Sequence, residues 1–210
     1  RKNIMRSALI RVIELALSPP VLFELQQKIF NDYAALKSEY SPILAMNYGI
    51  NILDVGCSTG TCAGSILDLN TCTLVGIDLH KRYVARAKRS FPDGHFLAMD
   101  ASKLGFKENT FDVVMINSVL HHLPNDVIIN SLSEIERSLR DDGSLLIAEP
   151  IFSKNRVVSN LLLTIDRGEY IRQRSEYRDF LSRFEIKCDN VFDYFPHQFC
   201  SFVAQKKVNG

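Results

Sequence analysis

The stretch ILDVGCSTGT, residues 52–61, holds the residue types best suited to chemistry. Gly56, Ser58 and Gly60 match G-x-S-x-G, in which a turn from strand to helix exposes a nucleophilic serine. Counted from Asp54, the same residues match D-x-G-x-x-x-G, a glycine loop whose backbone comes close to a bound cofactor. Ser58 is therefore either a nucleophile or a small residue in a binding loop.

A serine hydrolase would need partners for Ser58 elsewhere in the chain. Chain order permits a triad in which His121 is the base. Its acid would be Asp100 or Asp112. The oxyanion hole also needs a backbone donor from an earlier strand-helix loop, but everything before residue 50 is helical in period and lacks a glycine cluster. We keep serine hydrolysis as a remote alternative.

A nicotinamide dinucleotide fits this loop poorly. The pattern G-x-G-x-x-G, counted from Gly56, requires glycine where the chain has Ser58 and Thr61. Asp54, near the end of the first expected strand, would also repel a pyrophosphate. An acid here suits a ligand that presents a cation. S-adenosylmethionine has an ammonium group, a sulfonium centre and no phosphate, and the next helix offers free N–H groups to its carboxylate.

Further polar residues follow the later apolar runs. Asp78 ends VGID, Asp100 ends FLAMD and Asn117 follows FDVVMI. The carboxyl ends of parallel strands line the crevice where open α/β sheets bind ligands. We expect the carboxylate of Asp78 to accept hydrogen bonds from the ribose hydroxyls. That of Asp100 should accept one from the adenine amino group. The predicted cofactor site comprises Asp54, Gly56, Cys57, Ser58, Gly60, Asp78, Leu79, Asp100, Ala101, Asn117 and Ser118.

The elements that must position these residues alternate regularly after residue 50. Amphipathic segments separate short apolar runs, which predicts βαβ units and a mainly parallel sheet with helices on both faces. Coverage of both faces also explains why the runs are almost continuously hydrophobic. The expected strands are 50–55, 72–77, 95–99, 111–116 and 144–149, and the expected helices are 60–69, 81–90 and 126–139.

The two ends of the chain differ from this core. Residues 1–48 are helical in period, and we expect them to cap a core domain at 49–207. Residues 153–183 are expected to be helical and are rich in arginine. Segments 184–194 and 197–207 predict two strands joined by two residues. So short a link makes a hairpin, so the last strand should be antiparallel to its neighbour.

Composition narrows the class of protein. The chain has 210 residues and a formal charge of +1, so no overall attraction to nucleic acid is indicated. Its five cysteines are odd in number and include no C-x-x-C pair, so we expect neither a zinc site nor a disulfide framework. No apolar run reaches the roughly 20 residues of a transmembrane helix. We expect a cytoplasmic protein without a bound metal.

Four quoted pieces carry a resemblance to a known family: ILDVGCSTG, VGIDLH, FLAMDASKLGFKENTFDVVMINSVLHHL and EIERSLRDDGSLLIAEP. In this order they resemble the successive motifs of the class I S-adenosylmethionine-dependent methyltransferases, and the chain is similar to the small-molecule enzymes of quinone biosynthesis. The resemblance implies a Rossmann-like, seven-stranded, mainly parallel sheet with an antiparallel last strand. The family usually has glycine at the position of Ser58, so we interpret Ser58 as a tolerated loop residue.

The resemblance also implies the chemistry. Methyl transfer to a small-molecule acceptor is an in-line displacement, and a base is needed only if the acceptor must lose a proton. The candidates are His121, His122, Glu149 and His197. The histidines could instead bond backbone or pack against aromatic rings. Glu149 would either touch substrate or be a solvated end of its strand.

Two further questions stay open at this level. The arginines of the segment 156–187 form either a solvated, salt-bridged surface or a lid that holds an anionic acceptor, with Arg172 and Arg174 as the residues to test. The protein is either an active methyltransferase or a catalytically silent regulatory protein that only binds the cofactor. A homodimer is possible on either interpretation, with no nucleic acid partner.

Overall fold

The computed structural model describes residues 33–44, 49–153, 155–165, 170–194 and 196–207. Most of the expected N-terminal helical segment, residues 1–32 and 45–48, therefore lies outside the described residues. The elements in chain order are α3 (Tyr33–Leu44), β1 (Ile50–Val55), α4 (Thr61–Ile66), β2 (Cys72–Asp78), α5 (Lys81–Ser90), β3 (His95–Ala98), β4 (Phe111–Asn117), η1 (Leu120–His122), α6 (Asn125–Ser138), β5 (Leu139–Ile151), α7 (Val157–Ile165), α8 (Arg174–Phe180), η2 (Leu181–Arg183), β6 (Phe184–Tyr194) and β7 (His197–Lys206).

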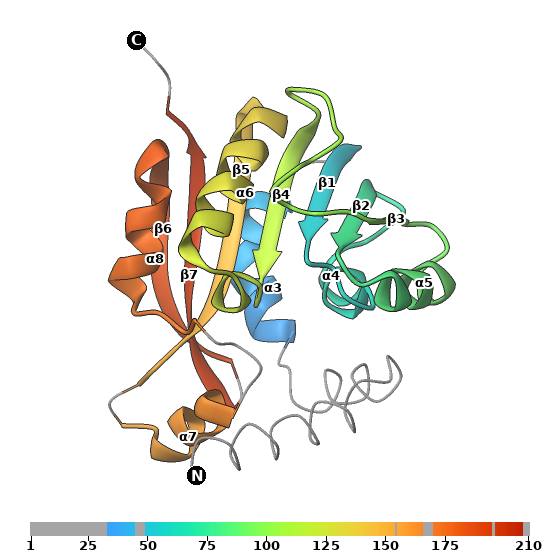
Figure 1. The fold of residues 1–210 in the computed structure, drawn as a ribbon. Coiled ribbons are helices and arrows are strands. Elements are labelled where there is room, and N and C mark those ends of the chain that lie inside the picture. Colours follow the sequence, from blue (N-terminus) through green and yellow to red (C-terminus); the bar gives the residue numbers. More distant parts are fainter. Residues whose placement is uncertain (1–32, 45–48, 154, 166–169, 195, 208–210) are drawn as a thin grey trace.

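The strands form one seven-stranded sheet in the order β3-β2-β1-β4-β5-β7-β6 (Figure 1). Neighbours from β3 to β5 are parallel, whereas β7 is antiparallel to both β5 and β6. The hairpin pairs Tyr194 with His197, as the two-residue link requires. The prediction of a Rossmann-like, mainly parallel sheet with an antiparallel last strand is confirmed.

Alternation along the strands divides the core into two layers. Ile52, Met115 and Leu146 point to one face, where they pack with residues of α3, α4 and α5. Leu53 and Val114, one residue on or back, point to the opposite face and pack with α6, α8 and η2. The sheet is therefore covered on both faces, as the continuous hydrophobic runs predict.

The change of face between α5 and α6 creates a topological switch point. The chain winds outward from β1 to β3 with its helices on one side, and then returns to β4, beside β1, and continues with α6 on the other. Connections leaving β1 and β4 diverge, so a crevice opens at the carboxyl ends of these two strands. Asp54 and Asn117 occupy those ends.

The structure differs from the expected elements in two places. β5 begins at Leu139 instead of residue 144, and a register shift between Phe111 and Val113 accommodates the added length. The arginine-rich segment holds two short helices, α7 and α8, and residues 170–173 between them are not helical. The expected helical structure of residues 153–183 is therefore present in α7, α8 and η2 and is wrong for residues 170–173.

Helix α3 is the described part of the N-terminal extension, and hydrogen bonds join it to the antiparallel strands β6 and β7. Its Glu39 accepts hydrogen bonds from Ser201 Oγ on β7 at 2.7 Å and from Asn190 Nδ2 on β6 at 3.2 Å. Leu36 and Tyr40 are buried against the strands.

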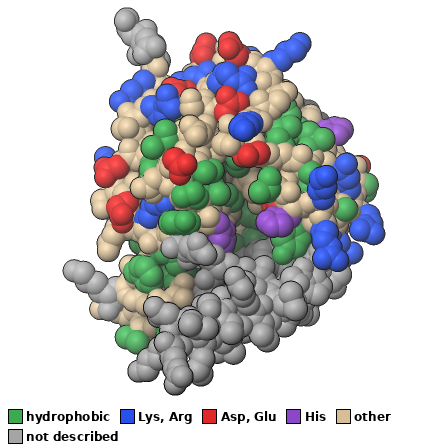
Figure 2. All heavy atoms as spheres, in the orientation of Figure 1, with side chains coloured by type: hydrophobic (Ala, Val, Ile, Leu, Met, Phe, Trp, Pro, Cys, Tyr) green, Lys and Arg blue, Asp and Glu red, His purple; other side chains and the backbone are tan. Residues whose placement is uncertain are grey.

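Among the described helices, none is long and apolar enough to cross a membrane. Basic side chains gather on α5, at the right of Figure 2.

Candidate functional site

The loop after β1 adopts the backbone geometry that a close-approaching ligand needs. Gly56 and Gly60 have φ of 73° and 77°, in the left-handed region that favours glycine. A Cβ at Gly56 would also collide with the side chain of Val119. The amides of Gly56 and Cys57 donate to Ile77 O on β2 at 2.8 and 2.9 Å, which fastens the loop to the sheet.

Ser58 sits at the centre of this loop with φ of 49°, a left-handed conformation that costs a non-glycine residue energy. Its amide donates to Asp78 Oδ2 at 3.0 Å. Its Oγ is buried and has no hydrogen-bond partner among the described residues, so no base contacts it. His121, the base of the hypothetical triad, is bonded to Glu149 instead. Ser58 therefore has the geometry of a loop residue that stands where glycine would be less strained.

Asp54 is the most unusual ionisable group in the crevice. Its side chain lies on β1 and the residue is only 3% exposed. Burial, and secondarily the charge of Asp78, raises the pKa of Asp54 to about 7. Its Oδ2 has no hydrogen-bond partner within the described part of the chain. A buried carboxylate without a partner is costly, and a cation bound beside it would remove that cost.

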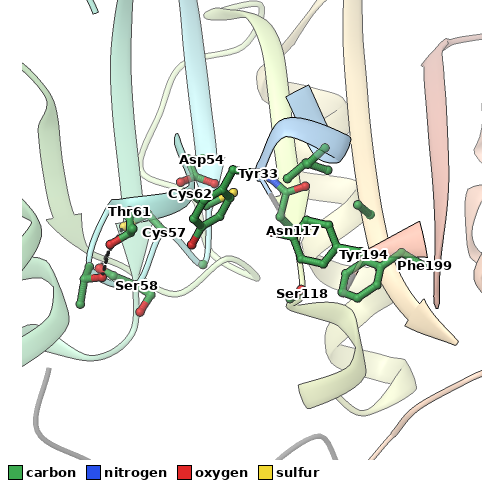
Figure 3. A pocket seen from close by; sticks show the side chains of 14 residues that line it. Tyr33, Asp54, Cys57, Ser58, Thr61, Cys62, Asn117, Ser118, Tyr194 and Phe199 are labelled. Carbon is green, nitrogen blue, oxygen red and sulfur yellow. Dashed lines mark hydrogen bonds between the residues drawn. The ribbon is translucent and has the colours of Figure 1, made fainter. Parts of the chain in front are cut away.

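A cavity of about 80 Å³ lies between the glycine loop and the β4 end. Figure 3 shows Asp54 and Cys57 on one side of it, with Asn117, Tyr194 and Phe199 on the other. Its size suits one end of a ligand, because whole ligand pockets measure about 300–1,000 Å³. The lining residues are Tyr33, Leu36, Asp54, Gly56, Cys57, Ser58, Thr59, Thr61, Cys62, Asn117, Ser118, Ala148, Tyr194 and Phe199.

The other predicted cofactor residues lie outside this cavity, along the carboxyl ends of β2 and β3. Asp78 accepts from Ser58 N and, through Oδ1, from His80 N at 2.7 Å. Leu79 is 69% exposed. Asp100 is exposed and bonded to Ser102, whose N–H and hydroxyl lower the pKa of its carboxyl group. Ala101 beside it is partly buried.

Glu149 organises the turn after β4. It is fully buried, and the solvated strand end considered from the sequence is wrong, because β5 continues to Ile151. Its carboxylate accepts from the backbone N–H groups of Val119 and Leu120 at 2.9 and 2.8 Å, and from His121 N at 3.3 Å. The ring Nδ1 of His121 lies 2.7 Å from Glu149 Oε2. These hydrogen bonds fix the backbone of residues 119–121, the turn that follows β4.

The histidine candidates fall in different environments. His121 is buried, whereas His122 is exposed with its ring centroid 4.0 Å from that of His121. His197 is partly buried, and its Nδ1 lies 3.1 Å from Ser159 Oγ on α7. Among these three, only His122 is exposed.

Arg172 is neither a solvated ion pair nor an open lid residue. It is 6% exposed, and its guanidinium donates to Leu120 O and Leu123 O at 2.8 Å and to Asn125 Oδ1 at 2.7 Å. It therefore binds the carbonyls of the turn whose N–H groups bind Glu149. The salt-bridged interpretation holds for Arg174 and Arg178, which both pair with Asp189 on β6. Arg167 lies outside the described residues.

Sequence reasoning missed several residues of the cavity wall. Tyr33 and Leu36 come from α3, and Tyr194 and Phe199 come from the hairpin, far along the chain from the glycine loop. No local motif marks them, because only the fold brings these segments together. Across the described residues no group of three or more histidine, cysteine, aspartate or glutamate side chains could hold a metal ion. All five cysteines are free.

Comparisons with known proteins agree with this geometry. A family model described as a methyltransferase domain matches residues 52–143. The demethylmenaquinone methyltransferase of Chlorobaculum tepidum is 30% identical over 112 residues, 53% of this chain and 46% of that protein. That of Beutenbergia cavernae is 36% identical over 101 residues, 48% of this chain and 41% of that protein. The chain thus spans less than half the length of these relatives.

A solved structure extends the likeness to the whole fold. The TehB-like S-adenosylmethionine-dependent methyltransferase from Corynebacterium glutamicum superposes with a TM-score of 0.61 at 22% identity, covering 81% of this chain and 87% of that one. Motifs, sheet order and matches together confirm the resemblance: residues 52–143 match a methyltransferase domain, and the chain is similar to the class I S-adenosylmethionine-dependent methyltransferases, including those of quinone biosynthesis.

Proposed function

We propose that this chain is an S-adenosylmethionine-dependent methyltransferase that acts on a small-molecule acceptor. The observation that carries the proposal is the buried Asp54 carboxylate, whose Oδ2 has no partner among the described residues and faces a glycine loop at the switch point of the sheet. A ligand cation completes this site, whereas a phosphate would not. The family match and the names of the relatives support the same conclusion.

In this proposal, residues along the crevice would hold the cofactor from its amino-acid end to its adenine. Asp54 would hold the ammonium group, and the open backbone of the loop would accommodate the methionyl chain. Asp78 would accept ribose hydroxyls with the lone pairs that Ser58 and His80 leave available. The exposed Leu79 would cover one face of adenine, and Asp100 would accept from its amino group. When bound, the cofactor supplies a methyl group on a positively charged sulfur.

The protein contributes chiefly alignment and exclusion of water. Good orientation of two reactants supplies roughly 7–11 kcal/mol in favourable cases. The Glu149 and Arg172 bonds on either side of the turn at 119–123 hold Asn117 and Ser118 at the mouth of the cavity. For an acceptor that must lose a proton, His122 would take it at a ring nitrogen, while His121 stays bonded to Glu149.

The acceptor is proposed to be a small molecule with an apolar ring. Because the amino-acid end of the cofactor would fill the cavity of about 80 Å³, the acceptor would lie outside this cavity, on the side of the sulfonium. The demethylmenaquinone named for the relatives is a compound of this kind.

We also propose a core domain at 49–207 with 1–48 as its cap, and a cytoplasmic location, in which the five free cysteines would stay reduced.

Titration calorimetry with S-adenosylmethionine and with NAD tests the cofactor. Micromolar binding of the first and no binding of the second is expected; the absence of S-adenosylmethionine binding by folded protein would refute the proposal. A screen of hydroxylated ring compounds, read out as formation of S-adenosylhomocysteine, then tests catalysis. Cofactor binding without turnover of any acceptor would favour the catalytically silent binding protein.

A further inference from the structure

Asn117, at the carboxyl end of β4, presents one unused hydrogen-bond donor to the cavity. The amide Oδ1 accepts from the hydroxyl of Tyr40 at 2.5 Å. The amide Nδ2 is buried and has no partner among the described residues, although Asn117 lines the cavity. Since buried donors are nearly always paired, this nitrogen marks a place where a ligand acceptor belongs.

Tyr40 decides which way the amide faces. Its side chain is fully buried on α3, and the two residues are 77 positions apart in the chain. A phenol hydroxyl that donates its proton selects the amide oxygen as its partner, so the nitrogen must turn to the other side, toward the cavity. Without Tyr40 the amide could rotate, and its oxygen would face the cavity half of the time or more.

Sheet geometry places this donor beside Asp54. Asp54 is in register with Met115, and Asn117 lies two residues farther along β4, so both side chains project from the same face. One strand spacing and two residues along a strand separate their Cα atoms by about 8 Å. A carboxylate acceptor and an amide donor at this separation match the ammonium and the carboxylate of one α-amino acid group.

We propose that Tyr40 is a positioning residue for the amino-acid end of the cofactor: it holds Asn117 with Nδ2 facing the cavity, where that nitrogen donates to the ligand carboxylate while Asp54 binds the ammonium group. The inference rests on the proposed function. Tyr40 would thus act on the cofactor indirectly, through Asn117. Two other α3 residues, Tyr33 and Leu36, line the cavity themselves.

The first test is Tyr40→Phe, measured by calorimetry with S-adenosylhomocysteine. Affinity should fall between about twofold and tenfold, because the freed amide samples two orientations of which one is competent. In an Asn117→Ala background, Tyr40→Phe should change affinity less than twofold, since a positioning residue acts only through its partner. A purely structural Tyr40 would lower affinity equally in both backgrounds, and that result would overturn the inference.

The matched control is Tyr177→Phe. Tyr177 is an equally buried tyrosine in the opposite core layer, where its hydroxyl accepts weakly from Arg172 N at 3.4 Å. Loss of this hydroxyl should leave the affinity for S-adenosylhomocysteine within twofold of the wild type. Thermal unfolding of each variant shows whether a loss of affinity follows loss of the fold.

A second variant keeps the inference testable should Tyr40→Phe fail to fold. Asn117→Asp places a negative charge where the ligand carboxylate is proposed to lie. It should weaken S-adenosylhomocysteine at least about thirtyfold. It should leave unchanged or strengthen binding of the decarboxylated analogue, 5′-(3-aminopropylthio)-5′-deoxyadenosine, which keeps the ammonium group and lacks the carboxylate. Equal weakening of both compounds would overturn the inference. Wild-type protein that binds neither compound would overturn the proposed function itself, and the inference with it.

Discussion

The substitution Asp54→Asn should stabilise the protein at neutral pH while abolishing its affinity for the cofactor. The side chain is 3% exposed and its Oδ2 is without a partner among the described residues. Asparagine has the same shape and does not ionise, so it removes the cost of a buried charge. The opposite effect on binding follows because an amide cannot neutralise an ammonium group.

The size of the effect follows from the pKa of Asp54, which rises from 3.8 to about 7 on folding. Each pKa unit corresponds to about 1.4 kcal/mol, so the ionised side chain destabilises the fold by about 4 kcal/mol. The raised value fixes the sign. The folded state binds the proton more tightly than the unfolded state, so the stability of the wild type falls as pH rises from about 4 and levels off above about 7.

Urea unfolding of the wild type and of Asp54→Asn between pH 5 and pH 8 would measure this difference. The gap in unfolding free energy should be about 2 kcal/mol at pH 5 and should grow to about 4 kcal/mol at pH 8. Refutation would be a variant less stable than the wild type at pH 8, or a gap that does not change with pH. Either result would mean that Asp54 is solvated or paired, and the cation site would lose its physical basis.

Four further predictions concern the same crevice. Binding of S-adenosylmethionine should release protons at pH 6 and fewer at pH 8, because the bound ammonium keeps Asp54 ionised and its raised pKa of about 7 leaves it mostly protonated at the lower pH; calorimetry in buffers of different ionisation enthalpy measures this number. Ser58→Ala should change cofactor affinity less than threefold, whereas a serine nucleophile would predict complete loss of activity. Ser58→Gly should raise unfolding free energy by up to about 1 kcal/mol through relief of the positive φ, measured by urea unfolding. Glu149→Gln should lower it by roughly 3 kcal/mol, because an amide group cannot accept from three backbone N–H groups and His121 together; a loss below 1 kcal/mol would contradict the role of Glu149 in the turn.

The sequence predicted the strands closely because their signals are local. Each apolar run from residue 50 onward became a strand, and the two-residue link at 195–196 determined the direction of β7. The glycine loop was equally predictable, since Gly56 and Gly60 are needed for their positive φ. Periodicity and turn chemistry act over a few residues, and such patterns are visible in a single chain.

The roles of Glu149, Arg172 and Tyr40 could not be predicted in this way. Each acts on a partner between 28 and 77 residues distant, such as His121 for Glu149 or Asn117 for Tyr40. Arginine-rich composition indicated a solvated surface, but Arg172 is buried because the turn after β4 leaves carbonyls that need donors. A run of charged residues predicts solvent exposure, because most arginines are exposed. Whether a given arginine is buried depends on which segments the fold brings together.

Local irregularities identify the same crevice independently of any motif. Four buried side-chain atoms lack partners among the described residues, and Asp54 Oδ2, Ser58 Oγ and Asn117 Nδ2 all belong to residues that line one cavity. Within the described ranges three non-glycine residues have positive φ, and two of them, Ser58 and Ser118, line this cavity. Strain and unpaired polar groups would be removed by selection in a purely structural region, so their concentration at the β1 and β4 ends indicates that a ligand compensates for them. These irregularities lie at the same edge of the sheet as the glycine loop.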